Sequence, residues 1–137
     1  MFFGNSRDAG IGIVQDSFNI NIDSHPFDNP NSQHMATYGG AQYDGGPGCV
    51  IYKGSQTPGN SVYTDGQIVK MEFNSEKGTL IFFVDGNQQP IFISGIKDKV
   101  KFVLGMCGTN RYCTVRSLKK LIVPQAQQVS NAKSIQW

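Results

Sequence analysis

The sequence predicts an all-β protein, an antiparallel β-sandwich of two sheets with little or no helix. Short runs of β-branched and aromatic residues recur along the 137 residues. Turn residues separate these runs at intervals of about 8–12 residues, which is typical of sandwiches. The chain contains 16 glycines, and no long segment carries the hydrophobic period of a helix. Its length fits a single domain, which we place at 1–123, followed by a polar tail or last strand at 124–137.

The most informative stretch lies at 66–93. Its first strand is indicated by the alternation of Val69, Met71 and Phe73 with Ile68, Lys70 and Glu72, the period of a half-buried strand. The polar segment 74–78 ends in glycine and predicts a hairpin loop with Gly78 at positive φ. The run 79–84 is β-branched and aromatic, which predicts the return strand.

A second turn and a third strand follow at once. Asp85-Gly86 is a strong signal for a tight turn. Residues 88–93 then predict a short strand, in which Pro90 indicates an edge position or a bulge, because proline donates no hydrogen bond to a neighbouring strand.

This order of strands and turns resembles the SPRY (B30.2) domain family. Asp65 to Val69 matches the start of the family pattern, and Gly78 to Phe82 matches its Gly-Thr-Leu-x-Phe run. Asp85-Gly86 stands where the family usually has Asn-Gly, and the tryptophan usual near 39–48 is absent. The resemblance implies two antiparallel sheets, no catalysis, and a ligand held by loops at one rim. It also implies membership of a larger intracellular protein with a scaffold or substrate-recognition role.

The elements before this stretch are shorter. Residues 9–14 predict a buried strand where backbones approach closely, since two glycines interrupt it. Residues 18–22 alternate and predict a half-exposed strand, whereas 23–33 is a loop by composition. Short strands are expected at 35–38 and 49–52. The glycine-rich segment 39–48 and the segment 53–64 are expected to be irregular.

After the central stretch, 96–101 is a polar connection and 102–106 predicts a buried strand. Residues 112–118 predict a further strand, which 121–123 can extend. The polar, unpatterned segment 125–133 is expected to be a mobile tail, and 134–137 can fold back as a last strand.

Charge and cysteine content exclude several classes of protein. The net charge of +2 implies neither a nucleic-acid partner nor a membrane partner. From Lys97 onward only Asp98 opposes eight basic residues, which favours a solvated strand edge over an anion-binding face. Cys49, Cys107 and Cys113 form no Cys-x-x-Cys motif, which favours free thiols in a reducing, cytoplasmic setting. A bridge between Cys107 and Cys113 remains an open alternative.

Signals for catalysis, metals and cofactors are weak, so we expect none of the three. His25 and His34 are the only histidines, and no nucleophile or phosphate-loop motif accompanies them. The oxygens of Asp23, Asp28, Asn29 and Asn31 can in principle bind calcium, but turn formation explains these residues more simply.

Binding is the better-supported class of function. Tyrosine offers a large contact area with a polar handle, and arginine can fork to a carboxylate. The candidate ligand-binding residues in or beside loops are Tyr38, Tyr43, Asp44, Tyr63, Arg111 and Tyr112. The expected partner is a protein or short peptide, and the expected state is a monomer. The alternatives are that some of these tyrosines only close the sandwich, or that the loops bind carbohydrate in a lectin-like manner.

Overall fold

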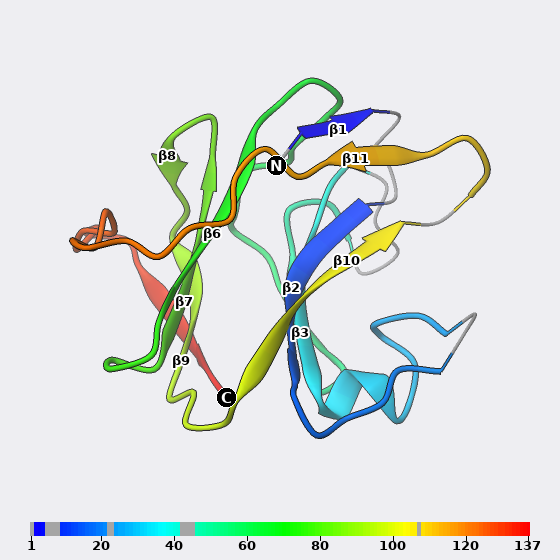
Figure 1. The fold of residues 1–137 in the computed structure, drawn as a ribbon, viewed down its shortest axis with the longest axis horizontal. Helices are drawn as coiled ribbons and strands as arrows, with labels where there is room; N and C mark the ends of the chain where they lie inside the picture. Colours follow the sequence, from blue (N-terminus) through cyan, green and yellow to red (C-terminus); the bar gives the residue numbers. More distant parts are fainter. Residues whose placement is uncertain (1, 5–8, 22–23, 42–45, 107) are drawn as a thin grey trace.

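The computed structural model describes residues 2–4, 9–21, 24–41, 46–106 and 108–137. Two sheets face each other (Figure 1), and the single helical element in these residues is the short 3₁₀ helix η1 (Asn31–Gln33). The prediction of an all-β sandwich is confirmed.

The first sheet is five-stranded and antiparallel, in the order β10-β2-β3-β4-β5. Its strands are β2 (Ala9–Gln15), β3 (Met35–Gly39), β4 (Val50–Tyr52), β5 (Ser55–Thr57) and β10 (Val100–Met106). The predicted strands at 9–14, 35–38 and 49–52 are therefore present.

The second sheet has the order β12-β9-β7-β6, with β8 also paired to β7. Its strands are β6 (Val69–Asn74), β7 (Thr79–Val84), β8 (Asn87–Gln88), β9 (Ile91–Ser94) and β12 (Lys133–Gln136). A separate ribbon pairs β1 (Phe2–Gly4) with β11 (Tyr112–Thr114). The pairing of β12 with β9 is parallel, the one departure from the predicted antiparallel arrangement among the described strands.

The β6–β7–β8 region forms as its sequence predicts. Gly78 has φ +63°, and a Cβ there would lie 2.5 Å from the Ile96 carbonyl oxygen, so glycine is required. Asp85 and Gly86 both have positive φ, as in a type I′ hairpin turn. The Asp85 carboxylate accepts hydrogen bonds from the Ile68 backbone N–H and the Gln67 side chain, both at 2.8 Å, which lower its pKa.

The expected irregularity at Pro90 is a bulge. Phe83 pairs with Gln88, but Leu80 pairs with Ile93. Three residue steps along β7, from Phe83 to Leu80, therefore correspond to five steps from Gln88 to Ile93. The two extra residues lie at Gln89-Pro90.

Two predictions from local pattern are wrong. Residues 18–21 form no strand, because Phe18 stacks on His34 at 4.3 Å between ring centroids instead of joining the sheet edge. Strand β5 lies in the segment expected to be irregular, and Lys53-Gly54, both at positive φ, form its hairpin turn. The predicted strand at 112–118 is also shorter, since β11 ends at Thr114.

The core lies between the two sheets and is rich in aromatic side chains at its centre. Tyr38 of β3 contacts Phe82 of β7 across the sheets, at 5.1 Å between ring centroids, and contacts Tyr63 at the same distance. Aliphatic side chains from both sheets fill the remainder, among them Ile11, Ile13, Val50, Val69, Leu80 and Ile93.

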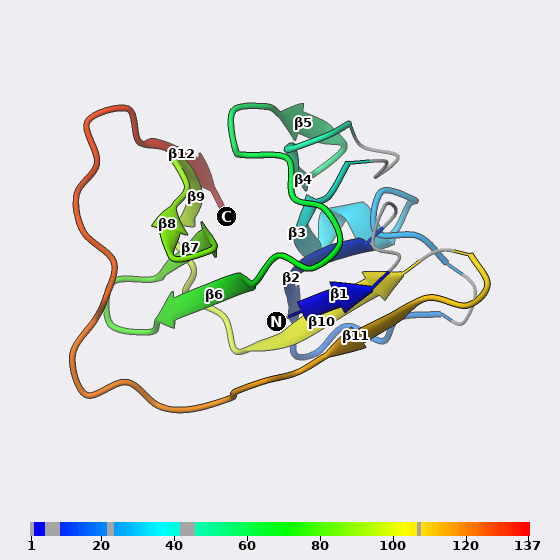
Figure 2. The ribbon, with the colours of Figure 1, turned by 90° about the horizontal axis from the view of Figure 1, so that it is seen from above.

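One side of the sandwich is closed by the end of the chain. The Trp137 ring stacks on Tyr52 of β4 at 5.0 Å, nearly parallel, and its backbone N–H donates to the Ser94 carbonyl. Strand β4 therefore faces β12 and β9 (Figure 2). At the other side, β10 and β6 are the end strands of their sheets.

Gly12 provides a test of how closely β2 and β3 pack. A Cβ at Gly12 would lie 1.8 Å from the Ala36 carbonyl oxygen, so the backbone must shift. We expect Gly12→Ala to lower the free energy of unfolding by about 3 kcal/mol, measured by urea denaturation. Gly105→Ala in β10 is the control, because its Cβ meets only ordinary contacts at 3.6 Å and beyond. Equal losses in the two variants would contradict this account.

Candidate functional site

Two of the predicted ligand-binding tyrosines belong to the core, which corrects that prediction. Tyr38 and Tyr63 are both 0% exposed. The Tyr63 hydroxyl lies 2.8 Å from the Ala9 carbonyl and 3.0 Å from the Tyr38 carbonyl, and the Tyr38 hydroxyl donates to the Ser61 carbonyl. Burial raises the pKa of Tyr38 well above its ordinary value. These two side chains hold the sandwich together and have no surface for a ligand.

The other predicted site residues divide into two groups. Tyr43 and Asp44 lie outside the described residues. Arg111 and Tyr112 adjoin each other at the start of β11, where Tyr112 is 58% exposed and Arg111 is half-buried. A Cβ at Gly108 would lie 3.0 Å from Arg111 Nε, so the guanidinium folds back over the preceding turn. Of the six predicted residues, the structure brings these two together at the surface.

A larger candidate surface lies on β10, which was predicted to be a buried strand. The strand is present, but it is not buried as predicted. Its side chains Phe102, Leu104 and Met106 are 48%, 38% and 42% exposed. Phe102 and Leu104 pair directly with Ile13 and Ile11 of β2, and paired residues share one face of a sheet. We call the three β10 side chains the open strip; they lie on the core-facing side of the sheet.

The open strip marks the edge of the hydrophobic core, which includes the inner side chains of β2 but not those of the open strip on β10. Ile11 and Ile13 are 0% exposed, whereas their partners on β10, Leu104 and Phe102, are 38% and 48% exposed. On the opposite sheet, Met71 and Phe73 of β6 pack against the core but remain half-buried. Among the described residues, the side where β10 and β6 end their sheets is thus apolar and only partly covered, although Cys113 of β11 also packs against the core. We call it the open side.

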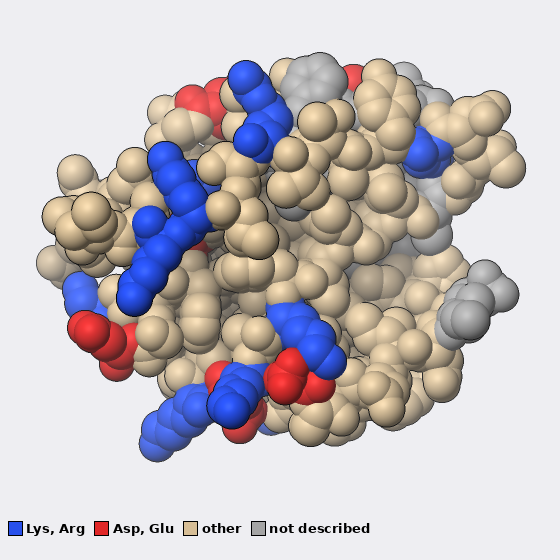
Figure 3. Space-filling model, viewed as in Figure 1, with Lys and Arg blue, Asp and Glu red and all other residues tan. Residues whose placement is uncertain are grey.

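Basic residues surround this side. The viewed face in Figure 3 is largely uncharged at its centre, with Lys and Arg side chains along its top, left and lower borders and with Asp and Glu side chains beside the lower ones. Exposed basic residues on and beside β10 and after β11 are Lys97, Lys99, Lys101, Arg116, Lys119 and Lys120. Asp16 pairs with Lys101 at 3.4 Å, and Asp98 lies between Lys97 and Lys99, so acidic charge partly offsets this group. Arg116, Lys119 and Lys120, by contrast, have no acidic residue between them.

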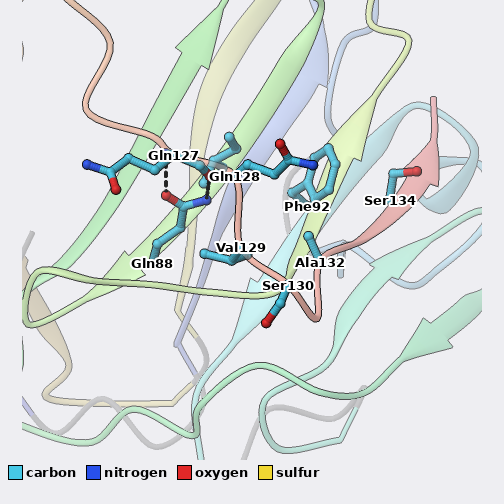
Figure 4. A pocket seen from close by; sticks show the side chains of 9 residues that line it. Gln88, Phe92, Gln127, Gln128, Val129, Ser130, Ala132 and Ser134 are labelled. Atoms are coloured by element: carbon cyan, nitrogen blue, oxygen red, sulfur yellow. Dashed lines mark hydrogen bonds between the residues drawn. The ribbon is translucent and has the colours of Figure 1, made fainter.

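A second candidate region is formed by the C-terminal arm, residues 115–137. Glu72 of β6 is only 7% exposed. Its carboxylate accepts from the backbone N–H groups of Gln125 (3.0 Å) and Ala126 (3.1 Å). The Gln88 side chain accepts from the Gln127 N–H (2.8 Å) and donates to its carbonyl (2.6 Å), as Figure 4 shows. The segment predicted to be a mobile tail is held by these bonds, and the predicted last strand is present as β12.

A cavity of about 370 Å³ lies between the arm and the sheet. Ile81 and Phe92 form apolar parts of its lining, and glutamine and serine side chains provide polar groups (Figure 4). Its lining carries no charged side chain. The arm therefore forms one wall of this cavity.

The titratable and metal-binding candidates serve local structure. His34 Nδ1 lies 2.6 Å from the Gln15 side-chain oxygen. The Asn31 amide donates to Ser24 Oγ and the His25 carbonyl, and Asp28 accepts from the His25 N–H, as in turn formation. Asp23 lies outside the described residues. Within the described ranges, no group of three or more His, Cys, Asp or Glu side chains is placed to hold a metal ion.

The thiols that the structure describes are unbridged. Cys49 and Cys113 are free, whereas Cys107 lies outside the described residues. Burial raises the pKa of the Cys49 thiol, which favours its protonated form over the reactive thiolate. In the part of the chain that the structure describes, no helix has the length and apolarity to cross a membrane.

Comparison with protein-family models, curated proteins and solved structures finds no match to this chain. The SPRY resemblance therefore rests on the sequence pattern at 65–86 alone.

Sequence reasoning missed the residues that hold the arm. Glu72 was placed on the outward, polar side of its strand, and nothing in the local sequence indicates that residues more than fifty positions later cover it. Trp137, the single tryptophan, carried the only available signal, since a large aromatic side chain at the end of a polar segment favours docking.

The Glu72 contacts allow a test of arm docking. Hydrogen bonds to a charged group contribute about 1.5–3 kcal/mol, so Glu72→Gln should weaken docking by roughly 1–2 kcal/mol while it preserves shape. We expect faster amide hydrogen exchange at Gln125 and Ala126, with exchange in β7 unchanged. Glu76→Gln, at an exposed position in the β6–β7 turn, is the control. Unchanged exchange at both amides would contradict the docking role of Glu72.

Trp137 reports on docking by its own fluorescence. The indole N–H and the Gln15 side chain both donate to Asp98 at 2.9 Å. These hydrogen bonds lower the pKa of Asp98, the indole having the larger effect, below the ordinary value of 3.8. Stabilisation by a group with a lowered pKa is complete above the unfolded-state pKa and is lost as pH falls through the folded-state pKa. We expect Trp137 emission to stay constant at neutral pH and shift to longer wavelength only below pH 3.8.

Asp98→Ala is expected to show the long-wavelength emission already at neutral pH and to lose the acid transition. Asp16→Ala should behave as the unchanged protein, because Asp16 pairs with Lys101 and not with the indole. If Asp98→Ala kept the same acid transition, another group would control Trp137.

Proposed function

We propose that this protein is a non-catalytic module that binds an extended segment of a partner protein along its open side. The observation that carries the proposal is the open strip. Phe102, Leu104 and Met106 leave 38–48% of their surface exposed on the face that forms the core in the neighbouring strand. Contiguous apolar surface of this kind marks interaction sites.

The geometry favours strand addition as the mode of binding. β10 is an end strand of seven residues, and the outer edge of such a strand presents backbone N–H and C=O groups to a partner strand. Alternate side chains of an added strand would lie on the inner face, beside the open strip. An apolar side chain at every second position would thus extend the core beyond β10.

Charge defines the flanks of the preferred segment. Lys99 and Lys101 are exposed near the start of β10, and Arg116, Lys119 and Lys120 follow β11 with no acidic neighbour between them. We therefore propose a partner with acidic residues beside its apolar positions, since complementary charge raises the association rate and the selectivity.

The proposed function is still protein or peptide binding, as the sequence predicts, but the proposed site lies on β10 and not at the predicted loop residues. Tyr38 and Tyr63 support the sheet from within, while Arg111 and Tyr112 remain as candidate contacts on β11. The SPRY resemblance, a role inside a larger intracellular protein, and a cytoplasmic setting belong to the same proposal. They are supported by the strand and turn pattern and by the free thiols Cys49 and Cys113.

The test is a peptide array with the purified chain, in which alternating apolar peptides carry acidic, neutral or basic flanks. A glycan array with calcium or chelator runs in parallel. Acidic-flanked peptides are expected to bind best. Leu104→Glu should then lower affinity by tenfold or more, because it places a charge in the open strip, while it leaves the urea midpoint nearly unchanged.

Ile20→Glu is the matched control, since Ile20 is 44% exposed but lies outside the strip. Equal loss in both variants, or no loss in Leu104→Glu, would contradict the open strip as the site. A sugar hit abolished by chelator would assign the protein to the lectin-like class instead.

A further inference from the structure

Among the described residues, the hydrogen bonds that hold the C-terminal arm to the rest of the molecule all lie in its distal part. In the described structure, no hydrogen bond joins residues 115–124 to another segment. This hinge also exposes large apolar side chains, with Val115, Leu118, Ile122 and Val123 between 57% and 101% exposed. Figure 2 shows it passing around the outside of both sheets before the chain returns as β12.

The distal part, by contrast, completes the body. Strand β12 pairs with β9 over four residue pairs, and Trp137 stacks on Tyr52 and bonds to Asp98. Lys70 donates to the Gln125 side chain at 2.6 Å, beside the Glu72 contacts. All of these contacts are non-covalent, and without the arm the side of the sandwich at Tyr52 is unclosed.

We infer that the arm is exchanged between two copies of this chain, so that each body is completed by β12 and Trp137 of the other copy. The docking contacts are the same whether the arm belongs to the same copy or to the second one, which makes exchange a low-cost route to a dimer. The inference departs from the expected monomer, and it does not depend on the proposed function of the open side.

The hinge supplies the reason why exchange is favoured. In a monomer, Leu118, Ile122 and Val123 lie in water. In the exchanged pair the two hinges run past each other around a two-fold axis, so these side chains can pack against their symmetry mates and leave water. Arg116, Lys119 and Lys120 carry like charge, so the pair should be more stable at higher ionic strength, where their repulsion is screened.

The first measurement is the mass of the full chain by light scattering over a dilution series. The chain has a mass of 15.0 kDa, and the inference predicts twice that value. Monomer at every concentration and salt would overturn it. The double substitution Leu118→Ser and Ile122→Ser should shift the mass toward monomer, whereas Leu104→Glu on the open strip should leave the dimer intact. The reverse pattern would assign the dimer to β10 and overturn the exchange.

The second measurement decides which body each arm joins. Phe92 and Ser134 are register partners in β9 and β12 and line the same cavity. Both are changed to cysteine in a chain carrying Cys49→Ala, Cys107→Ser and Cys113→Ser, and a short bis-maleimide is added. Exchange gives a covalent dimer on a denaturing gel. A linkage confined to single chains, or no linkage, would overturn the inference. The background chain without the two new cysteines is the control.

Discussion

The connection between the two sheets is the constraint on which the rest of the structure depends. Residues 58–67 lead from the first sheet to the second, and Tyr63 is buried in their middle. Its hydroxyl reaches β2 at the Ala9 carbonyl and β3 at the Tyr38 carbonyl, while Asn60 pairs with both backbone groups of Ile91 on β9 (3.1 and 2.8 Å). One short segment therefore fixes strands of both sheets, and the distance between the sheets follows from it.

Polar side chains replace missing strand partners at several places. Asn60 does so for Ile91, Gln88 for Gln127, and Asp85 for Ile68. In each case a side-chain amide or carboxylate bonds to a backbone group. The Asn60 bonds to Ile91 are buried, where an unmet hydrogen bond is costly. This use explains how a chain with only 16% charged residues stabilises irregular segments through asparagine and glutamine.

The sequence predicted those parts of the fold whose cause is local. The β6–β7 hairpin, the Asp85-Gly86 turn and the Pro90 bulge depend on residues close together in the chain, and they were found. The exposure of β10 and the burial of Glu72 depend on which segment covers which strand, and an alternation pattern does not contain that information. Of the tyrosines predicted to bind a ligand, Tyr112 is exposed, while Tyr38 and Tyr63 are buried in the core. A tyrosine beside a loop looks the same whether its hydroxyl meets water or a backbone carbonyl.

The two long sides of the sandwich differ in a way that joins these findings. At Tyr52, one aromatic side chain from the end of the chain covers the core, and Asp98 and Gln15 hold it in place. At β10 no described segment does the same, although the side chains there are as apolar as those inside. Both sides thus need cover supplied by an extended segment. On the closed side the C-terminal arm provides it, through a parallel strand. We argue that the open side accepts the same kind of cover from another molecule, because the physical requirement is the same: apolar surface next to an unpaired strand edge.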